Sequence, residues 1–302
     1  MTKVEATWRR LLAVVVALAM PAVACARPLP GTSGRTLVVG GVTRTYLLHT
    51  GGAAKPGRAL VLVLHGLGGS GAAIERRTRA TFDKLADRDG AVVVYPDALG
   101  DPHRWSDGWN AASATIPPDD LGFLSALIDA LAAELGVDRK RVFAAGLSNG
   151  AAMVYRLACE RPELVAAVAP VSGGMAPEVA RACPHGTTPV SIIRMHGTDD
   201  PIVAFGPSIH DVETWVRRDA CPARPISSRL PDADPGDGTQ TRVEVFEPCA
   251  AGTAVAFYTI EGGGHAWPGG EPKPGFARSG NTPRDFDAGA VIWDFFQKHP
   301  RR

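Results

Sequence analysis

Short apolar segments alternate with helix-like segments along most of this 302-residue chain. Segments 59–64, 91–95 and 164–169 are each long enough for one strand, and they lack the polar alternation of a half-exposed strand. Strands of this kind belong to parallel sheets that helices cover on both faces. The sequence therefore predicts an α/β fold with a mostly parallel central sheet.

The expected elements fill one domain, residues 35–302, with no large lid. An N-terminal antiparallel hairpin is expected because apolar segments 37–39 and 42–48 flank Gly40-Gly41. Segment 221–249 is interpreted as a surface excursion, since Pro, Asp and Gly dominate its middle. The remaining expected strands are 141–145, 190–195 and 254–260, and the expected helices are 73–86, 121–135, 151–159, 209–218 and 285–297.

Composition excludes two broad classes of protein. The hydrophobic fraction of 45% is that of a chain able to bury a core, which excludes disorder as the main state. The 32 Lys and Arg residues nearly balance the 31 Asp and Glu residues. A chain without a strong net charge is not expected to bind nucleic acid or an anionic membrane surface through its overall field.

The first 24 residues have the pattern of an export signal. Lys3, Arg9 and Arg10 precede the apolar segment 11–20, and small residues suited to signal-peptidase cleavage lead to Cys25. Ten apolar residues are too few to cross a bilayer, which takes roughly 20. We expect a signal peptide at 1–24, a leader at 25–34 and a secreted or periplasmic protein. A lipid anchor at Cys25 is an open alternative to simple cleavage there.

A candidate nucleophile lies in the pattern G-x-S-x-G at residues 146–150, with Ser148 at its centre. The pattern stands between an expected strand and an expected helix, where a strained turn needs small neighbours around an exposed serine. A serine hydroxyl is a weak nucleophile at neutral pH and requires a base, which in turn requires an orienting acid.

The acid and the base are expected on loops after later strands, in the chain order Ser, Asp or Glu, His. Two adjacent aspartates, Asp199 and Asp200, follow the strand expected at 190–195, and spacing does not choose between them. His265 follows the last expected strand and is the candidate base. His196, at a strand end before glycine, is interpreted as a structural hydrogen-bonding residue.

Two backbone N–H groups are candidates for stabilising a developing oxyanion. One belongs to Asn149, directly after the serine, and the other to Leu67, in the loop after strand 59–64. The same loop, 66–71, also matches the dinucleotide pattern G-x-G-x-x-G, with Asp97 as its acidic partner. A Ser-Asp-His set has no role in dinucleotide binding, so acyl transfer by an activated serine is the favoured interpretation.

Together these segments resemble the α/β-hydrolases of the poly(3-hydroxybutyrate) depolymerase and feruloyl esterase-like family. The resemblance runs from about Arg35 to His299. The motifs that carry it are LHGLGG at 64–69, DLGFL at 120–124, GLSNGAAM at 146–153, AAVAPVSGG at 166–174, HGTDDPIV at 196–203 and GGGHAWPGG at 262–270.

The resemblance implies a secreted serine esterase that acts on hydroxyalkanoate oligomers or polyesters, or on feruloyl-type esters. It assigns the acid to Asp200, and it implies the disulfides Cys159–Cys183 and Cys221–Cys249. Trp267 and Trp109 are candidates for an aromatic substrate wall, with ordinary packing as the alternative. We expect no cofactor and no metal, since H-E-x-x-H, C-x-x-C and P-loop patterns are absent from the sequence. A peptidase, an acyltransferase and an inactive binding protein are the alternatives.

Overall fold

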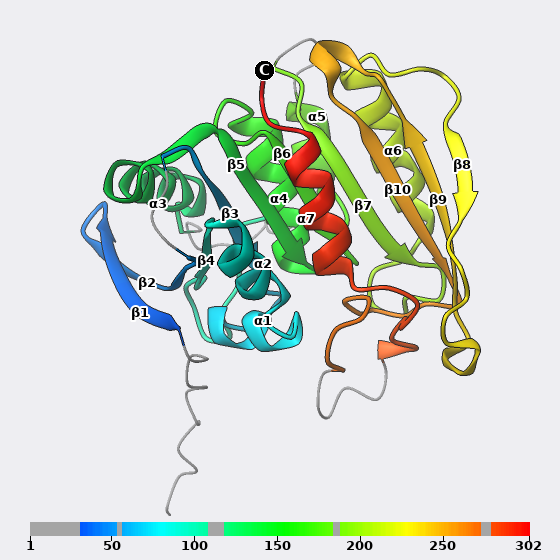
Figure 1. Cartoon of the computed structure of the whole chain (residues 1–302), viewed down its shortest axis with the longest axis horizontal. Helices are drawn as coiled ribbons and strands as arrows, with labels where there is room; N and C mark the ends of the chain where they lie inside the picture. The colour runs from blue at the N-terminus through cyan, green and yellow to red at the C-terminus, as the bar shows by residue number, and fades with distance from the viewer. Residues whose placement is uncertain (1–30, 53–55, 108–117, 184–187, 273–278) are drawn as a thin grey trace, which may run out of the picture.

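The structure is a computed structural model that describes residues 31–52, 56–107, 118–183, 188–272 and 279–302. Its centre is a ten-stranded sheet with the order β1-β2-β4-β3-β5-β6-β7-β10-β9-β8 (Figure 1). The strands are β1 (Thr32–Val39), β2 (Val42–Thr50), β3 (Arg58–Leu64), β4 (Val92–Pro96), β5 (Val137–Leu147), β6 (Ala167–Val171), β7 (Ser191–Gly197), β8 (Ile226–Arg229), β9 (Gln240–Phe246) and β10 (Val255–Glu261).

Helices lie on both faces of this sheet. They are α1 (Gly71–Arg77), α2 (Thr81–Asp89), α3 (Asp120–Leu135), α4 (Asn149–Glu160), α5 (Pro177–Ala182), α6 (Gly206–Arg218) and α7 (Ala288–Lys298), with short 3₁₀ turns η1 (Pro235–Asp237) and η2 (Ala250–Gly252). One core cluster packs α1, α2 and α7 against the sheet, and a second packs α3, α4, α5 and α6. Figure 1 shows α2 and α7 in front of the strands.

The middle of the sheet is parallel. Strands β4, β3, β5, β6, β7 and β10 pair in parallel, whereas β1, β2, β9 and β8 extend the two edges antiparallel. Every residue of β3, β4, β6 and β7 is buried, because helices cover both faces of these mostly apolar strands. The predicted α/β class, with a mostly parallel sheet and an N-terminal hairpin, is confirmed.

The turn of the β1–β2 hairpin favours glycine at both central positions. Gly40 and Gly41 have φ values of 57° and 79°, which side chains disfavour and glycine tolerates. Strand β1 begins at Thr32, so it includes the last residues of the segment expected as a leader.

The prediction of a single helix at 73–86 is wrong. This segment forms two helices, α1 and α2. Arg79 and Ala80 both have positive φ, and the Arg77 carbonyl at the end of α1 accepts the Glu271 N–H at 2.9 Å. A contact from a distant loop thus occupies a carbonyl that a continuing helix would use itself, and local sequence does not reveal this contact.

The prediction that segment 221–249 is a surface excursion outside the sheet is also partly wrong. Strand β9 pairs antiparallel with the apolar β10, and β8 pairs with β9, so this segment extends the sheet. The residues of β9 are mostly half-buried and those of β8 are exposed, which weakens the apolar signal of both strands. The short α5 was not expected.

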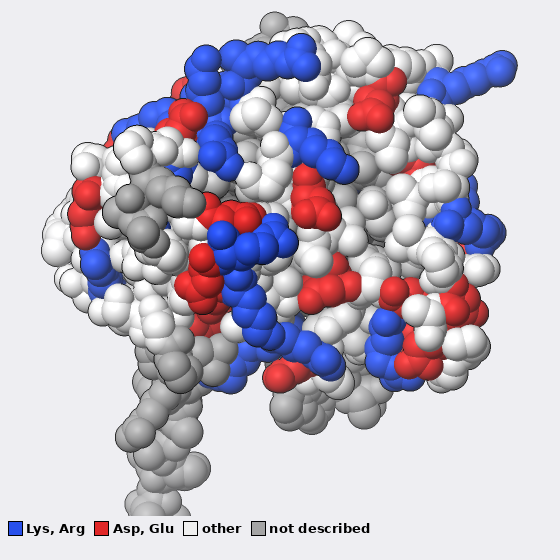
Figure 2. All heavy atoms as spheres, viewed as in Figure 1, with Lys and Arg blue, Asp and Glu red and all other residues white. Residues whose placement is uncertain are grey.

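Charged side chains of both signs are interspersed over the face drawn in Figure 2. This distribution agrees with the near balance of acidic and basic residues. Within the described ranges, no helix has the length and apolar character needed to span a membrane.

Candidate active site

Ser148 lies in a sharp turn between β5 and α4, with φ 58° and ψ −119°. This conformation is strained for a residue with a side chain. A Cβ on Gly146 would lie 2.4 Å from the Gly150 carbonyl oxygen, and a Cβ on Gly150 would lie 2.5 Å from the Leu64 carbonyl oxygen. Both glycines are therefore required for the turn that carries Ser148 at the C-terminal end of β5.

Asp200 and His265 meet beyond the C-terminal ends of β7 and β10. The Nδ1 atom of His265 lies 2.8 Å from Oδ2 of Asp200. The other carboxylate oxygen of Asp200 accepts the backbone N–H groups of Ile202 and Val203, both at 2.9 Å. Asp199 is exposed and its carboxylate accepts the adjacent Thr198 hydroxyl. Of the two aspartates, the structure places Asp200 against His265.

His196 makes a second contact with the Asp200 carboxylate. Its Nε2 atom lies 2.9 Å from the Val203 carbonyl oxygen and 3.3 Å from Oδ2 of Asp200. A guanidinium nitrogen of Arg194 lies 2.9 Å from Nδ1 of His196. Because a guanidinium only donates, Nδ1 accepts and the ring proton must be on Nε2, facing Val203 and Asp200. Burial lowers the pKa of His196, so the ring is neutral at pH 7.

Asp200 is ionised in this arrangement. Burial alone would raise the pKa of its carboxyl, but hydrogen bonds from His196 and His265 hold that pKa well below its usual range. The site therefore holds a buried carboxylate whose negative charge faces the Nδ1 side of the His265 ring.

The loop that carries Leu67 and the start of α4 at Asn149 both lie next to Ser148. A Cβ on Gly66 would lie 3.3 Å from Cβ of Ser148, so the loop after β3 runs close to the serine. Asn149 is the first residue of α4, where backbone N–H groups lack partners within the helix. Neither the Leu67 N–H nor the Asn149 N–H donates a backbone hydrogen bond within the described ranges.

Residues 103–105, in the segment after β4, bind both the loop after β3 and the start of α4. The Trp105 indole N–H donates to the His65 carbonyl oxygen at 2.9 Å, and the Trp105 backbone N–H donates to the Asn149 side-chain oxygen at 2.9 Å. The Gly68 N–H donates to the His103 carbonyl oxygen at 2.8 Å. Sequence analysis did not identify Trp105 as a site residue, because nothing in its local pattern predicts contacts with residues far away in the chain.

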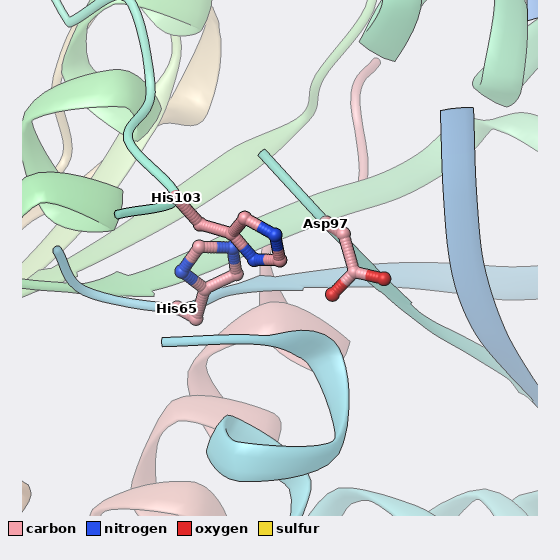
Figure 3. A group of neighbouring side chains, drawn as sticks. All are labelled: His65, Asp97 and His103. Carbon is pink, nitrogen blue, oxygen red and sulfur yellow. The ribbon is translucent and has the colours of Figure 1, made fainter. Parts of the chain in front are cut away.

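Among the described residues, His65, Asp97 and His103 form a cluster that resembles a metal site. Their potential ligand atoms lie within 4.8 Å of one another (Figure 3). However, the ring of His65 is already used on both sides: Nδ1 donates to the Gly66 carbonyl oxygen at 2.7 Å, and Nε2 accepts the Ala98 N–H at 3.1 Å. Burial lowers the pKa of His65, which agrees with a neutral ring.

The other two members are also engaged with the protein. The carboxylate of Asp97 accepts the Gly71 N–H at 2.7 Å and the Thr45 hydroxyl at 2.6 Å, and His103 donates to the Gly69 carbonyl oxygen at 3.1 Å. Through these hydrogen bonds, the three side chains hold the loop after β3 in place. The bonds also give Asp97 a role at the start of α1 in place of the ribose contact of the dinucleotide alternative.

Ser148 and His265 line one cavity of about 550 Å³. Its apolar rim includes Leu67 and Ile202, whose side chains are 47% and 46% exposed. The other described residues that line it are His65, Gly66, Gly68, Gly69, Ala73, Ile74, Arg76, Arg77, Leu147, Glu271, Pro272 and Ser279.

Trp267, a candidate for an aromatic substrate wall, does not line this cavity. Trp267 is 1% exposed and packs edge-on against Phe82, at a ring distance of 6.1 Å, in the core between the sheet and α2. Its place next to the His265 loop suggested contact with substrate, but the indole turns into the core. Trp109 lies outside the described residues.

Both implied disulfides are present. Cys159 of α4 is bonded to Cys183, just after α5, and Cys221 after α6 is bonded to Cys249 after β9. Each bond joins a helix-containing segment to a part of the chain more than 20 positions away. Cys25 and the rest of segment 1–30 lie outside the described residues.

Comparison with known proteins agrees with this architecture. A family model described as "Esterase PHB depolymerase" matches residues 44–220. "Putative esterase NocK" of Nocardia uniformis subsp. tsuyamanensis is 33% identical over 293 residues, covering 87% of this chain and 82% of the relative. Feruloyl esterase B of Piromyces equi is 28% identical over 72% of this chain, but the match covers only 40% of that relative.

Among solved structures, an acetyl xylan esterase from Aspergillus awamori is similar in fold. The TM-score is 0.65 at 16% sequence identity, over 88% of this chain and 99% of that protein. The shared fold is that of the α/β-hydrolases, as expected from the strand order and the turn around Ser148. The family match covers more than half of the chain, so this protein is a carboxylic ester hydrolase that belongs to the esterase PHB depolymerase family.

Proposed function

We propose that Ser148, His265 and Asp200 form the catalytic triad of a serine esterase that works through an acyl-enzyme. The observation that carries this proposal is the 2.8 Å contact between Asp200 and His265, in a site where His265 and Ser148 line the same cavity. An ionised carboxylate that accepts the Nδ1 proton leaves Nε2 of the imidazole as the base.

In the first step, the Ser148 hydroxyl oxygen attacks the ester carbonyl carbon while Nε2 of His265 takes the hydroxyl proton. Asp200 stabilises the resulting imidazolium, and the backbone N–H groups of Leu67 and Asn149 donate to the oxyanion. The intermediate collapses with cleavage of the ester C–O bond, and His265 returns the proton to the departing alcohol. Water then attacks the acyl-enzyme by the same steps and releases the acid and Ser148.

The proposed substrates are hydroxyalkanoate oligomers or polyesters, or feruloyl-type esters. A cavity of about 550 Å³ lies within the usual range for small-molecule sites, and the apolar side chains of Leu67 and Ile202 at its rim suit an acyl chain or an aromatic acid. The relatives named as a feruloyl esterase and an esterase support this choice.

We also propose that the protein is exported, with a signal peptide at 1–24 and a single catalytic domain after it. Two disulfides favour an oxidising compartment. Fractionation of cells that express the full chain would find the processed protein outside the cytoplasm. Radiolabelled fatty acid retained on the wild type but not on Cys25→Ser would establish the lipid anchor.

Hydrolysis of 4-nitrophenyl butyrate by the wild type and by Ser148→Ala tests the mechanism. We expect kcat to fall by about 10⁶ in the variant, as in other triads. Methyl ferulate and a soluble hydroxybutyrate oligomer would then rank the two substrate classes. Faster cleavage of a matched anilide than of the ester would favour a peptidase instead, and equal turnover by Ser148→Ala would overturn the proposal.

A further inference from the structure

Arg77 lines the cavity that holds Ser148 and His265, although the steps proposed above give it no role. It is the last residue of α1 and is half-buried. Its guanidinium forms no ion pair and no side-chain hydrogen bond with any residue in the described ranges. A partly desolvated cation with no ion pair to a described residue, and with only the charge of the exposed Glu271 acting on it, is poorly compensated, and burial of an uncompensated charge is unfavourable.

The backbone of Arg77 is held beside the catalytic loop. The Glu271 N–H donates to the Arg77 carbonyl oxygen at 2.9 Å, and a Cβ on Gly270 would lie 2.5 Å from the same oxygen. The end of α1 therefore packs directly against the segment that follows His265. This contact holds the Arg77 backbone in a defined position relative to His265, the proposed base.

The charges around Arg77 leave this part of the cavity cationic. Arg76 lines the cavity as well, and Glu271 is the acidic residue among the described residues that line it. Burial lowers the pKa of Arg77 and the charge of Glu271 raises it, but an arginine remains protonated throughout the working pH range. Glu271 is exposed, so water solvates its carboxylate and weakens its effect on a bound anion.

We propose that Arg77 binds a carboxylate of the substrate, which makes esters with a free carboxylate in the acid or alcohol portion the preferred class. This proposal rests on the proposed esterase function. A guanidinium presents two parallel N–H groups that match the two oxygens of a carboxylate. Folding has already removed part of the water around a half-buried guanidinium. A bound carboxylate therefore displaces few further water molecules and supplies the anion that the guanidinium lacks.

Matched pairs of esters test the proposal. One series is the mono-4-nitrophenyl esters of dicarboxylic acids from succinic to suberic, and a second is the acetyl esters of hydroxycarboxylic acids; each compound is compared with its neutral methyl ester. The readout is the ratio of kcat/KM for the charged ester to kcat/KM for the neutral one, corrected for spontaneous hydrolysis. We expect Arg77→Gln to lower this ratio by about tenfold in at least one series.

Three variants separate charge recognition from general damage. Arg77→Lys should retain part of the ratio, and Glu271→Gln should raise it by about twofold because a repulsive charge is removed. Arg79→Gln is the matched control, since Arg79 is exposed, lies two positions away and does not line the cavity. It should keep the wild-type ratio. An unchanged ratio in Arg77→Gln in both series would overturn the proposal.

Calorimetric titration of monomethyl adipate into Ser148→Ala and into Ser148→Ala/Arg77→Gln measures recognition without turnover. We expect about tenfold weaker binding in the second protein, and equal binding would refute the role of Arg77. If the wild type hydrolyses none of the esters, the proposed function fails. The titration then decides on its own whether Arg77 recognises carboxylates.

Discussion

Asp200 and His265 lie 65 positions apart in the chain, yet their side chains approach to 2.8 Å. The contact forms because β7 and β10 are neighbouring parallel strands, which brings the loops after their C-terminal ends together. His196, at the end of β7, makes a second contact with the same carboxylate. The neighbouring Asp199 points to solvent, so the two adjacent aspartates have different surroundings.

This difference predicts different effects of the same substitution. Asp200→Asn should lower kcat by about 10⁴, because the amide disturbs the tautomer of His265 and does not stabilise an imidazolium. Asp199→Asn should change kcat by less than about twofold, since that side chain is exposed. Initial rates on 4-nitrophenyl butyrate measure both. The larger loss in Asp199→Asn would show that the acid is assigned to the wrong residue.

Trp105 is predicted to act as a positioning residue for the oxyanion loop. Trp105→Phe removes the N–H that donates to the His65 carbonyl oxygen, so the loop that carries Leu67 loosens. We expect kcat to fall roughly tenfold with little change in KM, since misplaced donors affect the transition state more than the ground state.

Trp293→Phe is the control for the cost of losing a buried indole. Its N–H donates to an oxygen of Asp89 at 2.7 Å, away from the cavity. This variant should lose stability in urea unfolding but retain kcat. A similar fall of kcat in both variants would mean that Trp105 acts only through general stability.

We predict that the free energy of unfolding depends on pH through Asp83. Burial raises its pKa to about 6, although the Tyr95 hydroxyl donates to its carboxylate and opposes the shift; the charge of Glu75 adds to the increase. The folded protein therefore holds this proton more tightly than the unfolded chain, whose aspartates titrate near 3.8. Its contribution to stability is complete below about pH 4 and is lost as the pH rises through 6.

Asp83→Asn should consequently increase the free energy of unfolding at pH 8 by on the order of 2 kcal/mol. At pH 4 the variant should resemble the wild type, because the protonated carboxyl and the amide make similar hydrogen bonds. Asp294→Asn, at an exposed position of α7, is the matched control and should leave the pH profile unchanged. A variant less stable than the wild type at pH 8 would contradict the argument.

The Cys159–Cys183 bond closes a loop with a sequence separation of 24. In the chain-entropy treatment, a loop of this length restricts the unfolded state by about 3.5 kcal/mol. The double substitution Cys159→Ala/Cys183→Ala should lower the free energy of unfolding by about 3 kcal/mol. Urea titration measures the change, and peptide mass spectrometry without reduction identifies the pairing. A linkage of Cys159 to Cys221 would refute the assignment.

Much of the architecture was predictable because it depends on short-range patterns. Most residues of the buried parallel strands are apolar, as in residues 59–64 of β3 and in β4 and β6, and these runs identify the strands without knowledge of their neighbours. Gly146 is equally local, since a Cβ there would meet the Gly150 carbonyl oxygen, whereas Gly150 is required by the distant Leu64 carbonyl. Where burial is partial, as in β8 and β9, the local pattern was too weak and the prediction failed.

The sequence by itself determined the fold class, the turn that carries Ser148 and the set of residues from which a triad could be drawn. Spacing left Asp199 and Asp200 open and the family resemblance implied Asp200; the tertiary structure places Asp200 against His265 and turns Trp267 into the core. It also decided that Trp105 joins two loops and that Arg77 reaches the cavity. Each of these outcomes depends on which distant segments become neighbours in the sheet, and no pattern within a short window of sequence contains that information.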